Sequence, residues 1–198
     1  MGWNRLVDRS IDGSNPRTAT RALPAGEVTP GFVRLFILAS VGLLVLAAWR
    51  LNPLALQLSP LAVAILFGYS YTKRFTWASH LVLGLSLAGA PLGAWIAIRG
   101  DVALTPLLLG LAVLLWVAGF DVLYALQDLD FDRTSGLYSI PARFGLVGSL
   151  WISAALHAVM LAVLALLPAV YPPGLGTWYW IGWSGCALLI AYQHCVVR

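Results

Sequence analysis

Six long apolar stretches, separated by short breaks, constrain the fold of this chain more than any other feature of its sequence. Each stretch has about 20 residues, and a helix of that length crosses a hydrocarbon layer of about 30 Å. The breaks contain proline, glycine or charged residues. The sequence therefore predicts an all-α, polytopic transmembrane helical bundle with six spans, at about residues 31–48, 53–71, 80–98, 104–126, 147–167 and 175–196.

The composition supports the membrane interpretation. Hydrophobic residues make up 60% of the chain and charged residues only 10%, whereas an average soluble domain has about 25% charged residues. A soluble domain of this length would need more charge to cover its surface. The net charge of +4 is therefore better explained by membrane topology than by nucleic-acid binding, and we expect no nucleic-acid partner.

Basic residues are distributed very unevenly between the two sides of the predicted bundle. If both termini and the even-numbered connections share one side, that side has ten basic residues and the other has two, Arg50 and Arg99. Positive residues concentrate on the cytoplasmic side of membrane proteins. We therefore expect a multi-pass protein of the cell inner (plasma) membrane, with residues 1–30 and the loop at 128–146 in the cytoplasm. The ten are Arg5, Arg9, Arg17, Arg21, Arg34, Lys73, Arg74, Arg133, Arg143 and Arg198.

The N-terminal segment contains a polar triad at a helical spacing. Asn4, Asp8 and Asp12 are four residues apart, and a helix turns by about 100° per residue. The three side chains should therefore share one face of a helix.

A second acidic cluster follows the fourth apolar stretch. Asp121, Asp128 and Asp132 are separated by seven and four residues, so they form a single stripe if the helix continues through them. Tyr124 would flank this stripe. Asp130 would point the opposite way, which favours a solvated loop acid. Asp121 follows an uninterrupted apolar run, and an acid in such a place is costly unless it is paired, metal-bound or functional.

Two oxygen-rich faces on the same side of a membrane suit Mg²⁺, a hard cation that proteins often share between carboxylates and substrate phosphates. Arg17 and Arg21, one helical turn apart, and Lys73 are expected beside these acids. Such cations can bind a diphosphate, although they could also serve only to orient the chain in the membrane. The residues therefore indicate a diphosphate held between two carboxylate stripes through Mg²⁺.

Three stretches carry a resemblance to a known family. The segment NRLVDRSID at residues 4–12, continued by NPRTATRALPAG at 15–26, resembles the first aspartate-rich motif of UbiA prenyltransferases. The segment DVLYALQDLDFDR at 121–133 resembles the second motif, and YSYTKRFT at 69–76 resembles the basic inner loop between them. The resemblance covers essentially the whole chain. One departure is Arg5, because many members have an aspartate at this position.

The resemblance implies Mg²⁺-dependent transfer of a polyprenyl group from polyprenyl diphosphate to an aromatic acceptor acid in quinone biosynthesis. We rank 4-hydroxybenzoate narrowly above a dihydroxynaphthoate of menaquinone synthesis as the acceptor. Family members usually have nine helices, so residues 1–198 are expected to be one prenyltransferase domain truncated at both ends. Implied metal ligands are Asn4, Asp8, Asp12, Asp121, Asp128 and Asp132, of which the five aspartates are catalytic; implied substrate-binding residues are Asn4, Arg17, Arg21, Lys73 and Tyr124.

Two alternative functions could also use acidic residues in a membrane protein. A CDP-alcohol phosphotransferase resembles this chain in its aspartates and Mg²⁺, but that family packs its acids into one short motif, whereas these clusters lie about 110 residues apart. A transporter with intramembrane carboxylates is the non-enzyme alternative. His80, His157 and His194 are scattered, and we interpret them as packing or interfacial residues.

Overall fold

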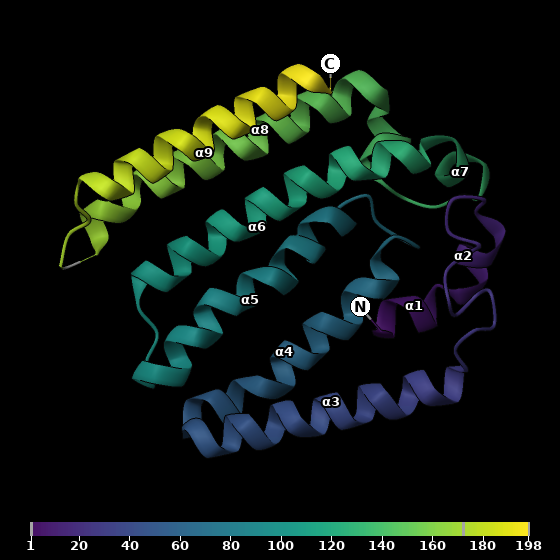
Figure 1. The fold of residues 1–198 in the computed structure, drawn as a ribbon, viewed down its shortest axis with the longest axis horizontal. Coiled ribbons are helices and arrows are strands. Elements are labelled where there is room, and N and C mark those ends of the chain that lie inside the picture. The colour runs from purple at the N-terminus through teal and green to yellow at the C-terminus, as the bar shows by residue number, and fades with distance from the viewer. Residues whose placement is uncertain (1, 172, 198) are drawn as a thin grey trace.

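The computed structural model describes residues 2–171 and 173–197, and within these residues the chain is helical, without a strand. The long helices lie side by side, and the short ones gather at one end of the bundle (Figure 1). This arrangement confirms the predicted all-α bundle. Its elements are α1 (Gly2–Val7), α2 (Arg9–Ser14), α3 (Pro30–Leu51), α4 (Pro53–Thr72), α5 (Ser79–Arg99), α6 (Leu104–Ala125), the 3-10 turn η1 (Leu126–Asp128), α7 (Leu129–Thr134), α8 (Ile140–Val170) and α9 (Thr177–Val196).

Five helices of the described chain, α3, α4, α5, α6 and α8, are long and apolar enough to cross a membrane. Large apolar side chains such as Phe32 and Leu38 are exposed along α3, as expected for a surface that faces lipid. A helix also forms at the sixth predicted span, as α9, but it is not among the five. Several tryptophans and tyrosines, with Gln193 and His194, make α9 less apolar, and a sixth crossing stays a prediction.

Polar caps define where the long helices begin. The Thr29 side chain accepts a hydrogen bond from the Phe32 amide at the start of α3, and Asn52 does the same for α4. The Asn52 side-chain amide also donates to the Ile96 carbonyl at 2.8 Å, which joins the start of α4 to the end of α5. Gly100 ends α5 in the left-handed region, at φ 70°, where glycine carries no steric penalty.

Small residues bring α5, α6 and α8 close together in the centre of the bundle. A Cβ placed on Gly84 of α5 would lie 2.4 Å from the Leu114 carbonyl oxygen of α6, and one on Gly110 would lie 3.1 Å from the Ala88 oxygen. On the other side of α6, a Cβ on Gly119 would meet the buried ring of His157 at 2.6 Å. Close approach of backbones at small residues is the usual way in which membrane helices associate.

The segment at 128–146 is more helical than the predicted loop. It contains α7 and the first turn of α8, which begins at Ile140 rather than at residue 147. Ser139 caps α8 by accepting from the Ala142 amide. Gly145 then interrupts the helix with a φ of 70°, so α8 is kinked near its start. The cap at Ser139 starts the helix early, and the glycine permits the change of direction.

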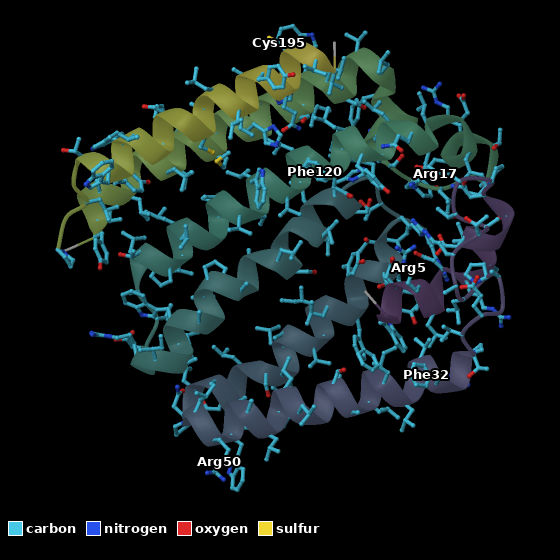
Figure 2. The ribbon with its side chains drawn as sticks, in the orientation of Figure 1. Arg5, Arg17, Phe32, Arg50, Phe120 and Cys195 are labelled. Carbon is cyan, nitrogen blue, oxygen red and sulfur yellow. The ribbon has the colours of Figure 1, made fainter. Side chains whose placement is uncertain are left out.

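Both aspartate-rich segments and the basic connection between α4 and α5 lie at the same end of the bundle (Figure 1). Arg50 lies at the opposite end (Figure 2). The described residues thus confirm the predicted grouping of acids and cations on one side; Arg198, also assigned to that side, lies outside them. The side that faces the cytoplasm stays a prediction.

Candidate active site

A cavity of about 770 Å³ opens at this polar end, between α1, α2, α4, α5, α6 and α7. One part of its wall carries acids and cations from both aspartate-rich segments. The other part is apolar and includes Leu83 and Leu87 of α5 with Val117 and Phe120 of α6. Figure 2 shows Arg5 and Arg17 near the polar end and Phe120 further along α6. The cavity therefore offers a charged end and an apolar end to one bound molecule.

The first triad keeps the predicted helical spacing although the helix is interrupted at Asp8. Backbone hydrogen bonds from Asp8 to Asn4 (2.9 Å) and from Asp12 to Asp8 (2.7 Å) continue across the interruption. The Asn4 side-chain amide donates to Asp8 at 2.8 Å. Asp8 pairs with Lys73 at 2.7 Å, and Asp12 accepts from Arg21 at 2.8 Å. Both carboxylates are buried, and each has a cation in contact.

The second acidic cluster departs from the predicted single stripe. The α-helix stops at Ala125, and η1 separates Asp121 on α6 from Asp132 on α7. Asp128, at the end of η1, receives two hydrogen bonds from the guanidinium of Arg17, one of them from Nε at 2.8 Å. The tighter 3-10 turn and the new helix change the angle between successive side chains. The condition for a single stripe, a helix that continues through all three acids, is therefore not met, although all three acids line the cavity.

Arg17 joins the two aspartate-rich segments. Besides Asp128, it donates to the Tyr124 hydroxyl at 2.9 Å and stacks over that ring at 5.1 Å from its centroid. The Asn15 side-chain amide adds a third bond to Asp128 at 2.9 Å. The hydrogen bond with Asp128 raises the pKa of the Arg17 guanidinium, against a smaller opposing effect of burial. Arg17 is thus a permanent cation at the centre of the site, and sequence reasoning missed the contribution of Asn15.

Asp121 has a partner that the sequence interpretation treated as a packing residue. His80, buried at the start of α5, lies with Nδ1 2.7 Å from the Asp121 carboxylate. Its other nitrogen accepts a hydrogen bond from the Ile140 amide at 3.2 Å, so Nε2 carries no proton and Nδ1–H donates to Asp121. His80 therefore connects α5, α6 and the start of α8, and it orients Asp121.

The remaining acids differ from each other. Asp132 lines the cavity together with Ser139, the cap of α8. Asp130 does not line the cavity, in agreement with its predicted position on the opposite side of the helix.

His157 and His194 lie away from the cavity lining and contact each other at 2.8 Å between α8 and α9, which agrees with a packing role.

The carboxylates at the site suit a divalent cation in their chemistry. Asp8 Oδ1 and Asp12 Oδ2 are buried and make no hydrogen bond, and carboxylate oxygens are the ligands that Mg²⁺ prefers. Within the described residues, however, no three His, Cys, Asp or Glu side chains converge closely enough to hold a metal. Cations lie against these carboxylates instead. The donor set therefore fits Mg²⁺, provided that the cations move aside.

Comparison with known proteins assigns the family. The model of the UbiA prenyltransferase family matches residues 1–198, the whole chain. The chain belongs to the UbiA prenyltransferase family. This UbiA chain is therefore an enzyme of the class that transfers prenyl groups, and the rival reading as a CDP-alcohol phosphotransferase or a transporter is excluded.

Curated relatives of this UbiA chain include 4-hydroxybenzoate octaprenyltransferases of several bacteria. The protein of that name from Vibrio cholerae (strain O395) is 36% identical over 197 residues, which cover 98% of this chain and 68% of the relative. The one from Pseudomonas putida (strain W619) is 36% identical over 200 residues, covering 98% of this chain and 65% of the relative. The chain thus spans about two thirds of the length of these relatives.

Solved structures agree with the fold. The apo structure of a UbiA homologue from Aeropyrum pernix K1 superimposes with a TM-score of 0.91 at 38% identity, covering 98% of this chain and 73% of the other. A UbiA homologue from Archaeoglobus fulgidus bound to GPP and Mg²⁺ gives a TM-score of 0.75 at 20% identity, covering 98% and 69%. At that lower identity the likeness shows the fold alone.

Proposed function

We propose that this UbiA enzyme transfers a polyprenyl group from polyprenyl diphosphate to 4-hydroxybenzoate, with Mg²⁺, at the cytoplasmic side of the inner membrane. The observation that carries the proposal is the cavity, which combines a charged end with an apolar end. A polyprenyl diphosphate has the same two parts. The 4-hydroxybenzoate octaprenyltransferases among its relatives and the GPP and Mg²⁺ of the Archaeoglobus structure support this choice of substrates and metal.

The charged end of the cavity would hold the diphosphate. Lys73, Arg17 and Arg21 carry the positive charge there, and each now contacts a carboxylate. Mg²⁺, if held by Asn4, Asp8, Asp12, Asp121, Asp128 and Asp132, would neutralise the leaving group. Once those carboxylates are engaged, the three cations are free to donate hydrogen bonds to the diphosphate oxygens and to stabilise the departing anion.

The apolar end would hold the reacting carbon and the start of the prenyl chain. The allylic C–O bond breaks with its electron pair leaving on the diphosphate, and the ring carbon of the acceptor then supplies the pair for the new C–C bond. Loss of a ring proton restores aromaticity. Side chains such as Leu83, Val117 and Phe120 would exclude water from the cation formed between these steps. Tyr124 holds Arg17 through its hydroxyl and its ring, at the side of the cavity where the diphosphate would bind.

The proposal is tested by measuring prenyl transfer in membranes that contain the protein. Polyprenyl diphosphate and Mg²⁺ are supplied with either 4-hydroxybenzoate or a dihydroxynaphthoate, and Asp121→Ala serves as the inactive control. Prenylated 4-hydroxybenzoate that disappears with a chelator and in the control would support the proposal. Product with the naphthoate alone would replace the acceptor, and the absence of both product and diphosphate release would refute the assignment.

A further inference from the structure

Arg5 differs from the other basic residues of the cavity wall in its hydrogen bonding. Four basic side chains, Arg5, Arg17, Arg21 and Lys73, line the cavity. The last three each contact a carboxylate oxygen at hydrogen-bonding distance. The Arg5 side chain donates no hydrogen bond to any described residue, and its buried Nη1 atom has only an ion-pair contact with Asp12 Oδ2 at 3.7 Å. Arg5 therefore has unused hydrogen-bonding capacity in the cavity wall.

The nearest acid does not satisfy Arg5. Asp12 Oδ2 lies 3.7 Å from Arg5 Nη1, which is beyond a hydrogen bond. The other oxygen of Asp12 already accepts from Arg21 at 2.8 Å. A buried donor without a partner is costly, and more so when it is charged. A bound anion that reached Arg5 would remove this cost.

We propose that Arg5 binds the carboxylate group of the aromatic acceptor, an inference that rests on the proposed function. A guanidinium presents parallel N–H groups whose spacing matches the two oxygens of a carboxylate. Tyr69 of α4 lines the same cavity as Arg5. An aromatic acid bound in this cavity could therefore contact both the Arg5 guanidinium and the Tyr69 ring.

The other cations are worse candidates for this task. Arg17, Arg21 and Lys73 contact the carboxylates that we assign to the metal, so their release coincides with arrival of the diphosphate. Arg74 does not line the cavity and donates instead to the Val7 carbonyl at 2.9 Å. Arg5 alone among these described cations could bind an acid without first leaving a hydrogen-bonded partner.

The test compares the binding of an acid with that of its uncharged amide. Dissociation constants are measured for 4-hydroxybenzoate and 4-hydroxybenzamide with the purified protein, Mg²⁺ and an unreactive thiolodiphosphate analogue of the prenyl donor. The same pair of measurements is made with a dihydroxynaphthoate and its amide. Because each preference is a ratio within one protein sample, a variant that is only partly folded still gives a valid value.

The wild type should prefer at least one acid over its amide by about tenfold or more, since a hydrogen bond to a charged group contributes about 1.5–3 kcal/mol. Arg5→Gln should bring that preference close to one, and Arg5→Lys should retain part of it. Arg9→Gln is the matched control, because Arg9 is exposed on α2 and does not line the cavity; it should keep the full preference.

Three results would overturn the assignment. One is an acid preference that Arg5→Gln leaves intact, another is the lack of any preference in the wild type, and the third is a larger loss of affinity for the thiolodiphosphate than for the acid. The proposed function is separable from it. Acid binding that depends on Arg5 without prenyl transfer would refute only the function, and prenyl transfer with an intact preference in Arg5→Gln would refute only the role of Arg5.

Discussion

The contact between α5 and α6 at Gly84 predicts a large effect of a very small substitution. A Cβ at Gly84 would lie 2.4 Å from the Leu114 carbonyl oxygen and 3.1 Å from its carbon, and real Cβ contacts are essentially never shorter than 3.0 Å. The two helix backbones must therefore separate by about 0.6 Å, the difference between 3.0 and 2.4 Å. No side-chain rotation can relieve this overlap, because the three nearest atoms on α6 all belong to the Leu114 backbone.

The comparison with Gly89→Ala isolates the cost of the overlap. Gly89 is also on α5, but a Cβ there meets nothing within 4 Å. Both substitutions gain up to about 1 kcal/mol of helix propensity, whereas only Gly84→Ala adds an overpacking cost of about 1–3 kcal/mol. For a chain of this size, that difference corresponds to a melting temperature lower by roughly 2–12 °C.

The assay is thermal unfolding of the wild type and both variants in the same detergent, followed by intrinsic tryptophan fluorescence. Prenyl transfer is measured in parallel, because α5 carries His80 and α6 carries Asp121, whose contact at 2.7 Å would be disturbed. We expect Gly84→Ala to lose both stability and activity. Equal melting temperatures for Gly84→Ala and Gly89→Ala would show that the helices are not in backbone contact here.

Three further predictions concern the site. His80→Leu removes the donor to Asp121 and should lower kcat/KM by about 10–100-fold with a higher Mg²⁺ requirement, whereas an unchanged Mg²⁺ titration would leave His80 a packing role only. Lys73→Ala should raise the KM for the prenyl diphosphate at least about tenfold, with the KM for the acceptor little changed; the reverse pattern would contradict its assignment to the diphosphate. Chelation of divalent cations should abolish transfer by the wild type and added Mg²⁺ should restore it, so activity that persists in excess chelator would exclude a metal-dependent mechanism.

The sequence predicted the elements of this fold well because membrane helices are marked by composition alone. The apolar runs located the long helices, and the spacing of Asn4, Asp8 and Asp12 correctly placed them together. The start of α8 was missed, since a cap at Ser139 and a kink at Gly145 leave the apolar pattern almost unchanged. Local signals of this kind shift a helix end by several residues.

The contacts within the site were harder to predict, because they join residues that are distant in the chain. His80 and Asp121 are 41 residues apart, and nothing near His80 in the sequence indicates an acid. Asn15 reaches Asp128 across 113 residues. The position of His80 just after the basic connection was the one available signal. The 3-10 turn that separates Asp121 from Asp132 also gave no pattern, since its three residues continue the helix in composition.

The pairing of carboxylates with cations has a consequence for the order and strength of binding. Without ligands, Asp8, Asp12 and Asp128 are each neutralised by a neighbour, so a lone Mg²⁺ must compete with three cations and a lone diphosphate must compete with the carboxylates. When the metal and the diphosphate bind together, Mg²⁺ binds the carboxylates and the diphosphate binds the cations that the metal has displaced from them. By linkage, each ligand should then raise the affinity for the other by the same factor. This end of the cavity should therefore bind the metal–diphosphate complex more tightly than either component alone.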